Sequence, residues 1–140
     1  LARHLLARVP LFQVVSLPIR DKLLAALKLE LVDPGSAITR SGQKPRRIVF
    51  VIEGLLQVQF EGETVGQFKP GDYFGNHSLI LDEPATADVI AASYAELMYL
   101  SQSDYDEIKE LYPEFVEMIA SAMSVNSEQM SDWMIRGVVL

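Results

Sequence analysis

The sequence contains no cysteine and only two histidines, His4 and His77, among its 140 residues. The absence of cysteine excludes a disulfide framework, a cysteine-ligated zinc site and thiol catalysis, and it is consistent with a reducing compartment. Two isolated histidines also argue against a histidine-rich metal site, which needs several imidazoles and carboxylates. No GxSxG, P-loop or HExxH pattern is present, so we expect neither catalytic residues, nor a metal site, nor an enzymatic function.

Long apolar runs are also missing. No run approaches the roughly 18 residues that cross a bilayer, and the first twelve residues carry charges too early for a signal peptide. We therefore expect no direct membrane insertion of this segment. The sequence begins at Leu1 and not at Met, which suggests a piece of a longer protein.

Basic residues are scarce overall, giving a formal net charge of −7, and they are unevenly placed. Residues 1–50 hold nine lysines and arginines against three acids, whereas residues 51–140 hold three against sixteen. A general nucleic-acid binder needs a basic footprint, so nucleic acid is not an expected partner. The asymmetry has two interpretations: solvated faces that differ in sign, or an acidic field that any anionic ligand of the second half must enter.

Apolar residues make up 49% of the chain and charged residues 22%, which is typical of a globular domain. Helical spacing of apolar residues predicts helices over 1–9 and 19–31, within an N-terminal helical segment 1–32. From 33 to 101 the chain turns to short β-branched or alternating runs separated by turn residues, which is typical of strands. The runs are AITR, RIVFVIEG, LLQVQF, ETVGQF, DYFG, ADVIAAS and AELMYLS.

Helical patterns return in the C-terminal segment 103–140. Ser103 precedes an acidic turn and is predicted to cap a helix that ends at Leu111, before Pro113. One apolar face of a long terminal helix is then predicted, which packs on the core, forms a dimer or acts as a mobile lid. Its residues are Phe115, Ile119, Ala122, Met123, Met130, Trp133 and Met134.

The predicted fold class is α+β: a single domain, 1–140, with an antiparallel β-roll or jelly roll of about eight strands flanked by N-terminal helices and a long C-terminal helix. Glycines occur where its strands must turn or approach closely. The motifs are Asp33-Pro34-Gly35, Arg40-Ser41-Gly42, FVIEG at 50–54 and KPGDYFG at 69–75. With VPLF at 9–12, this framework resembles the cyclic-nucleotide-binding domain family along nearly the whole chain, and is most similar to the type attached to cation channels.

The resemblance implies a phosphate-binding cassette at 74–89, where backbone N–H groups and an arginine hold an anion. The cassette positions are Phe74, Gly75, Asn76, His77, Ser78, Ala85, Thr86 and Ala87. The resemblance also places Val58 and Phe68 on the wall that faces the base. His77 has two interpretations, a ligand contact that depends on pH or a partner of a nearby carboxylate.

Two cassette side chains depart from the family pattern. Asn76 stands where the family has a ribose-binding glutamate, and Ala85 stands where it has the phosphate-binding arginine. Losing a charged hydrogen bond weakens binding roughly ten- to hundredfold, and Asp82, Glu83 and Asp88 add negative charge. We expect weak or absent binding of cAMP and cGMP.

The sequence is compatible with three different occupants of the interior of the roll. The chain could fill it with its own residues 134–140, as some channel relatives do, unless this tail is simply frayed. It could hold a neutral nucleoside or another uncharged small molecule, or bind cyclic nucleotide after all. We expect no cofactor beyond such a ligand.

The expected function is that of a cytosolic regulatory domain, which belongs to an ion channel or transporter chain and moves its flanking helices together. Its partners would be the rest of that chain, a small-molecule nucleotide or nucleoside, and further copies in a homo-oligomer. The alternatives are a dimerisation or scaffold module without a ligand, and a true cyclic-nucleotide sensor with an atypical pocket.

Overall fold

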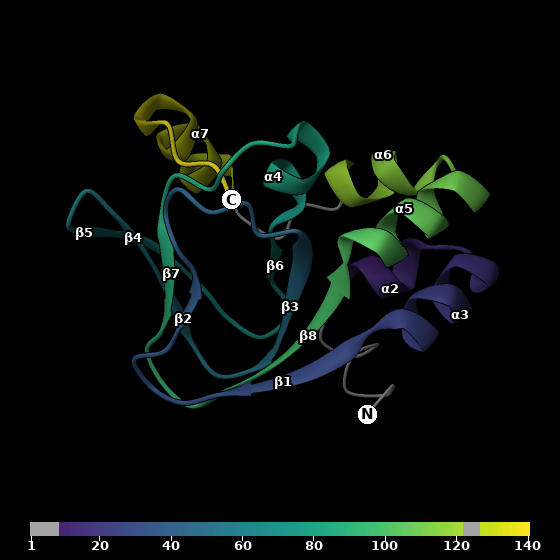
Figure 1. The fold of residues 1–140 in the computed structure, drawn as a ribbon, viewed down its shortest axis with the longest axis horizontal. Helices are drawn as coiled ribbons and strands as arrows, with labels where there is room; N and C mark the ends of the chain where they lie inside the picture. Colours follow the sequence, from purple (N-terminus) through teal and green to yellow (C-terminus); the bar gives the residue numbers. More distant parts are fainter. Residues whose placement is uncertain (1–8, 122–126) are drawn as a thin grey trace.

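The computed structural model describes residues 9–121 and 127–140, which form eight strands and six helices (Figure 1). The helices are α2 (Leu11–Val14), α3 (Leu17–Ala26), α4 (Asn76–Leu81), α5 (Gln102–Leu111), α6 (Phe115–Ser121) and α7 (Ser127–Arg136). The strands are β1 (Lys28–Val32), β2 (Ala37–Thr39), β3 (Arg47–Glu53), β4 (Leu56–Phe60), β5 (Glu63–Phe68), β6 (Tyr73–Phe74), β7 (Asp88–Ala91) and β8 (Ala95–Ser101). The α+β class and the predicted β-roll are confirmed.

All strand pairs are antiparallel and lie in two four-stranded sheets, ordered β1-β8-β3-β6 and β2-β7-β4-β5. Each of the seven predicted runs contains one of the strands β2 to β8. The prediction of a helix over 19–31 is wrong at its end, because α3 stops at Ala26 and residues 28–32 form β1. This segment reads Lys-Leu-Glu-Leu-Val, an alternation that suits a strand as well as a helix, and the edge of β8 pairs with it along its whole length. The predicted helix over 1–9 lies almost entirely outside the described residues.

Two tight turns shape the roll near the candidate functional site. Glu61 and Gly62 both have positive φ, 52° and 82°, so they form the two-residue turn whose twist matches a β4–β5 hairpin. At the second turn, the Asp72 N–H donates to the Lys69 carbonyl at 2.9 Å, and the Lys69 N–H donates to Asp72 Oδ2 at 2.8 Å. This turn delivers the chain into β6.

The C-terminal helices differ from their prediction in two ways. The cap of α5 is Ser101, whose hydroxyl accepts from the Asp104 N–H, and not Ser103, because β8 runs directly into the helix. The single apolar face predicted from Phe115 onward is also wrong: Phe115 and Ile119 pack in one cluster and Trp133 in another. Residues 122–126, with Ala122 and Met123, lie outside the described residues.

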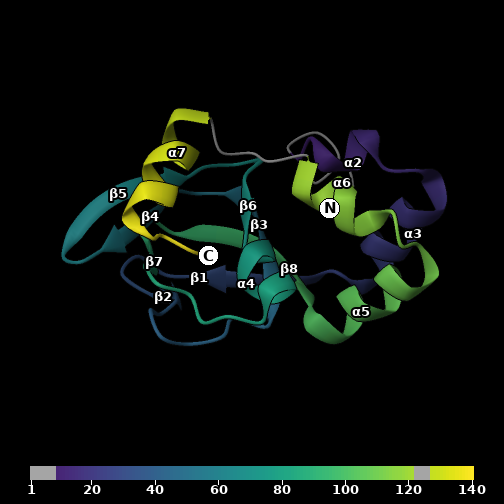
Figure 2. The same cartoon turned by 90° about the horizontal axis from the view of Figure 1, so that it is seen from above.

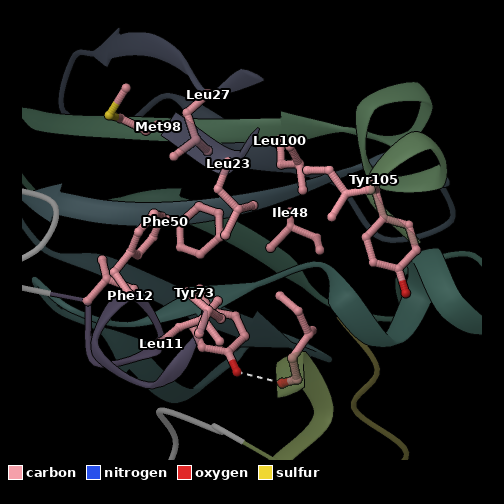
Figure 3. Packing of buried hydrophobic residues seen from close by; sticks show 14 of the residues in the cluster. Leu11, Phe12, Leu23, Leu27, Ile48, Phe50, Tyr73, Met98, Leu100 and Tyr105 are labelled. Carbon is pink, nitrogen blue, oxygen red and sulfur yellow. Dashed lines mark hydrogen bonds between the residues drawn. The ribbon is translucent and has the colours of Figure 1, made fainter. Parts of the chain in front are cut away.

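Two apolar clusters form the core. The first joins β3, β6 and β8 to α2, α3, α5 and α6, which gather at one end of the roll (Figures 1 and 2). Figure 3 shows its centre, where Phe12 meets Phe50 edge-on at 5.9 Å between ring centroids and Phe50 lies 5.6 Å from Tyr73. The second cluster lies within the roll and includes Trp133 of α7. Within the described residues, no helix is both long and apolar enough to cross a membrane.

Candidate functional site

The first wall of the site is the start of α4, immediately after β6. Gly75 precedes the helix with φ 97°, and a Cβ there would collide with the Arg47 carbonyl of β3, so only glycine fits. Asn76 and Ser78 follow it into the first turn and are 7% and 3% exposed. Asn76 Nδ2 and Ser78 Oγ have no hydrogen-bond partner among the described residues. The turn at Gly75 is therefore present, with two buried polar side chains, and its role as a phosphate-binding cassette stays a prediction.

The second wall is the loop between α4 and β7. Its backbone is paired with the loop after β2, because the Ala85 N–H donates to the Gln43 carbonyl at 2.9 Å and the Gly42 N–H donates to the Ala85 carbonyl at 2.7 Å. Ala85 and Ala87 are fully buried, at 1% and 0% exposure. This pairing joins segments more than 40 residues apart and holds Thr86 opposite α4.

Residues of the loop after β2 partly neutralise the acids of the cassette. Asp88 Oδ1 accepts the Ser41 N–H at 2.7 Å, and Lys44 Nζ lies 3.3 Å from Asp82 Oδ1. No lysine or arginine lies between Lys69 and Lys109 in the sequence, but the fold brings Lys44 to the cassette from a distant segment. Two of the three acids thus have partners of their own, and Glu83 remains exposed.

The space between the two walls is taken by the end of the chain. We call residues 137–140 the tail. The Thr86 N–H donates to the Val139 carbonyl at 3.0 Å, and the Ser78 N–H donates to the Leu140 carbonyl at 3.2 Å. Thr86 Oγ1 accepts the Val139 N–H at 2.8 Å and donates to the Gly137 carbonyl at 2.7 Å. Figure 2 shows the C-terminus ending between α7 and α4.

Two tail side chains complete the second cluster. Val138 and Leu140 are 7% and 6% exposed and pack in the cluster that contains Ala85 and Ala87. Val58 and Phe68, the predicted wall facing the base, are buried in it as well, at 0% and 1% exposure. The cluster thus joins the predicted wall of the ligand pocket to side chains of the chain's own tail.

The tail is aimed by α7, which lies across the β4–β5 hairpin (Figure 2). Trp133 Nε1 donates to the Val65 carbonyl at 3.1 Å, and its ring meets Phe68 edge-on at 5.8 Å between centroids. A Cβ on Gly66 would lie 2.8 Å from the Trp133 ring, so this glycine permits the close approach of α7 to β5. Arg136 adds an exposed ion pair to Glu63 at 3.3 Å.

Sequence patterns did not point to Gly66, because a lone glycine inside a strand has several explanations. Of the predicted tail segment 134–140, only residues 137–140 dock. Met134 and Ile135 point outward at 77% and 86% exposure. His77 is half-buried on α4, and its side chain has no carboxylate partner within the part of the chain that the structure describes.

A buried hydrogen bond connects the site to α6. Tyr73, two residues before the cassette glycine, donates from its hydroxyl to the Ile119 carbonyl at 2.6 Å (Figure 3). Burial raises the pKa of Tyr73 far above its usual range, so the hydroxyl stays a donor. The turn before it carries a second shifted group: burial raises the pKa of Asp72, although the Lys69 N–H and charge oppose the shift. Among the described residues, no cluster of acids and histidines could hold a metal ion.

Comparison with known proteins gives a consistent result. The family of cyclic nucleotide-binding domains matches residues 29–112. The cyclic nucleotide-gated potassium channel mll3241 of Mesorhizobium japonicum is 33% identical over 115 residues, which cover 82% of this chain and 32% of the channel. The human potassium/sodium hyperpolarization-activated cyclic nucleotide-gated channel 2 is 32% identical over 111 residues, covering 79% of this chain and 12% of that one. The chain thus spans a third or less of either channel.

Solved structures agree on the fold. The C-linker/CNBHD of zELK channels, crystallized in the presence of cAMP, has a TM-score of 0.74 at 29% identity and covers 86% of this chain and 65% of that chain. The cAMP-bound PfPKA-R has a TM-score of 0.76 at 17% identity, covering 96% of this chain and 45% of that chain, which is a likeness of fold alone.

Proposed function

Because the chain belongs to the family of cyclic nucleotide-binding domains, related to those of ion channels, we propose that it is a cytoplasmic regulatory domain of a channel or transporter whose ligand site is occupied by its own tail. In this proposal cAMP and cGMP bind weakly or not at all. The domain acts through the position of its helices, which the docked tail sets. It performs no catalysis.

The observation that carries the proposal is the use of the cassette donors. Thr86 N–H, Thr86 Oγ1 and Ser78 N–H are groups that an anion on this cassette would need, and all three bond to tail atoms. A nucleotide must therefore break these bonds and displace two buried apolar side chains, Val138 and Leu140, before it gains any contact. Ala85 offers no compensating charge.

Two further features support a low nucleotide affinity. Lys44 is the basic side chain that the fold brings near the cassette, and its ion pair to Asp82 offsets its charge. Asn76 is a neutral residue in place of a carboxylate, so its bond to a ribose hydroxyl would be weaker than a charged one. Each effect is expected to weaken nucleotide binding by about tenfold. Together with the displacement of the tail, they favour a dissociation constant above about 100 μM for the nucleotide.

Calorimetric titration of the intact chain with cAMP and with cGMP tests the proposal. We expect no saturable heat below about 100 μM nucleotide, equivalent to about −5.5 kcal/mol. A low-micromolar isotherm for either nucleotide would contradict the proposal and favour the sensor with an atypical pocket. The double variant Ala85→Arg with Asn76→Glu is the matched gain-of-binding control, and it should bind more tightly than either single variant.

The exposed residues that could support the scaffold alternative differ from those predicted. Trp133 is 5% exposed and packs on its own chain, so it cannot form the predicted Met/Trp dimer face. Met134 and Ile135 remain exposed beside it. Sedimentation of the intact chain and of a Met134→Ser, Ile135→Ser variant separates the two hypotheses, because only a scaffold predicts a dimer that this variant loses.

A further inference from the structure

The four tail residues supply a complete set of contacts with the cassette. The bonded tail groups are the carbonyls of Gly137, Val139 and Leu140 and the N–H of Val139, all of them backbone atoms. Val138 and Leu140 add the apolar contacts. Binding sites recognise extended peptides in this way, through hydrogen bonds to the peptide backbone and apolar contacts with its side chains.

The tail and the helix that carries it contact different parts of the roll. Trp133 and Arg136 hold α7 to the β4–β5 hairpin, whereas the tail bonds to Thr86 and Ser78. Gly137 lies at the junction with φ 84°, and a Cβ there would meet nothing within 4 Å. The N–H groups of Gly137 and Val138 both donate to the Trp133 carbonyl of α7 at 2.9 Å. Release of the tail therefore opens the Val138 bond, while the contacts of Trp133 and Arg136 can keep α7 on the hairpin.

The charge of the cassette suits a neutral occupant. Ala85 removes the cation expected for a phosphate, Lys44 is paired with Asp82, and Glu83 stays exposed. A peptide with uncharged side chains offers carbonyls to Thr86 and Ser78 without bringing a negative charge close to these acids. The side chains of the occupant already present, Gly-Val-Val-Leu, are all uncharged.

From these contacts we propose that the cassette is a peptide-recognition site, and that it binds the tail of a second copy of the chain when its own tail is released. The proposal rests on the proposed function in one respect, namely that the tail and not a nucleotide is the ligand. Within one chain the linked tail has an effective concentration on the order of millimolar, so the intact chain excludes a free tail at lower concentrations. Release of the tail in one copy opens its cassette to another copy, which is the exchange of an identical element.

The test uses the full-length chain with Val138→Asp and Leu140→Asp as receptor, because two buried charges release the tail. The probe is a labelled, amidated peptide of residues 134–140, followed by fluorescence anisotropy. We expect saturable binding with a dissociation constant at or below about 1 mM, and no binding below that concentration to the intact chain. A Val138→Asp peptide should bind at least tenfold more weakly, whereas the exposed Ile135 makes the Ile135→Ala peptide the matched control.

Absence of saturable binding to a receptor that circular dichroism shows to be folded overturns the proposal, as does equal binding of the Val138→Asp peptide. Where the double variant fails to fold, Leu140→Asp alone serves as receptor. The second-copy part is tested by sedimentation of the receptor mixed with a chain that carries Thr86→Val and an intact tail. A mixed dimer is expected, and monomers only would overturn this part. The proposed function would be contradicted by nucleotide binding to the intact chain, and not by the peptide result. The two failures are therefore distinguishable.

Discussion

Thr86 and Val139 are joined by two hydrogen bonds that run in opposite directions. The Thr86 N–H donates to the Val139 carbonyl at 3.0 Å, and the Val139 N–H donates to Thr86 Oγ1 at 2.8 Å. The residues are 53 positions apart, and the same hydroxyl also donates to the Gly137 carbonyl. One threonine therefore fixes three of the tail's four polar contacts with the cassette.

Thr86→Val removes the hydroxyl and keeps the shape of the side chain. Two hydrogen bonds are lost, at about 1 kcal/mol each, so we expect the free energy of unfolding to fall by about 1–2 kcal/mol. Urea denaturation followed by the fluorescence of Trp133, the only tryptophan, measures the change. Thr64→Val on the exposed side of β5 is the matched control and should stay within about 0.5 kcal/mol. Equal effects of the two variants would contradict the assigned role of Thr86.

Gly66→Ala tests how α7 is seated. The added methyl would lie 2.8 Å from the Trp133 ring, so α7 must shift, at a cost of about 1–3 kcal/mol. Trp133→Ala removes the obstacle, and the double variant should be less destabilised than the sum of the single variants. Strict additivity in chemical denaturation would show that Gly66 acts in some other way.

Tyr73→Phe tests the connection between the cassette turn and α6. The variant leaves the buried Ile119 carbonyl without its donor, so we expect a loss of about 1–3 kcal/mol in the free energy of unfolding. Amide exchange in α6 should quicken at the same time. Tyr94→Phe, at a tyrosine that is 48% exposed, is the control and should leave both measurements unchanged. A Tyr73→Phe chain as stable as the control would contradict the proposed connection.

Asp72 gives a pH dependence whose sign follows from its burial. Burial raises its pKa above 3.8, so the folded chain binds this proton more tightly than the unfolded chain. Asp72 therefore opposes folding above the raised pKa, and the penalty shrinks as the pH falls towards 3.8. Asp72→Asn keeps an acceptor for the Lys69 N–H, and its stability advantage over the parent should be largest near neutral pH and decline on acidification.

Denaturation of Asp72→Asn and the parent between pH 4 and pH 7 provides the comparison. Asp106→Asn, at an acid whose side chain is 52% exposed, corrects for the general loss of one negative charge. An advantage of Asp72→Asn that grows as the pH falls would contradict the assigned direction of the pKa shift.

Much of the roll was predictable from local sequence. The runs from Ala37 to Ser101 are β-branched or alternating and are separated by glycines or other turn residues, so β2 to β8 and the turn at Gly75 could be predicted. β1 was missed because its five residues suit both periodicities, and only the edge of β8 decides between them. Local signals fail where a distant partner selects the conformation.

The site itself was only half predictable. The identities of Asn76 and Ala85 indicate a weakened anion site, and the apolar tail was one of several candidate occupants. Docking of Val139 on Thr86 and the approach of Lys44 to Asp82 depend on contacts 53 and 38 residues apart. A four-residue segment is too short for its sequence pattern to predict such contacts. The fold was therefore needed to choose among the candidate occupants of the roll.

Amide hydrogen exchange at Val139 in the intact chain tests the central claim most directly, because its N–H is bonded only when the tail lies on Thr86. We predict protection of at least about tenfold over an unstructured peptide, corresponding to about 1.4 kcal/mol, and its loss in the Val138→Asp, Leu140→Asp variant. A Val139 amide that exchanges at the unstructured rate in the intact chain would contradict the account.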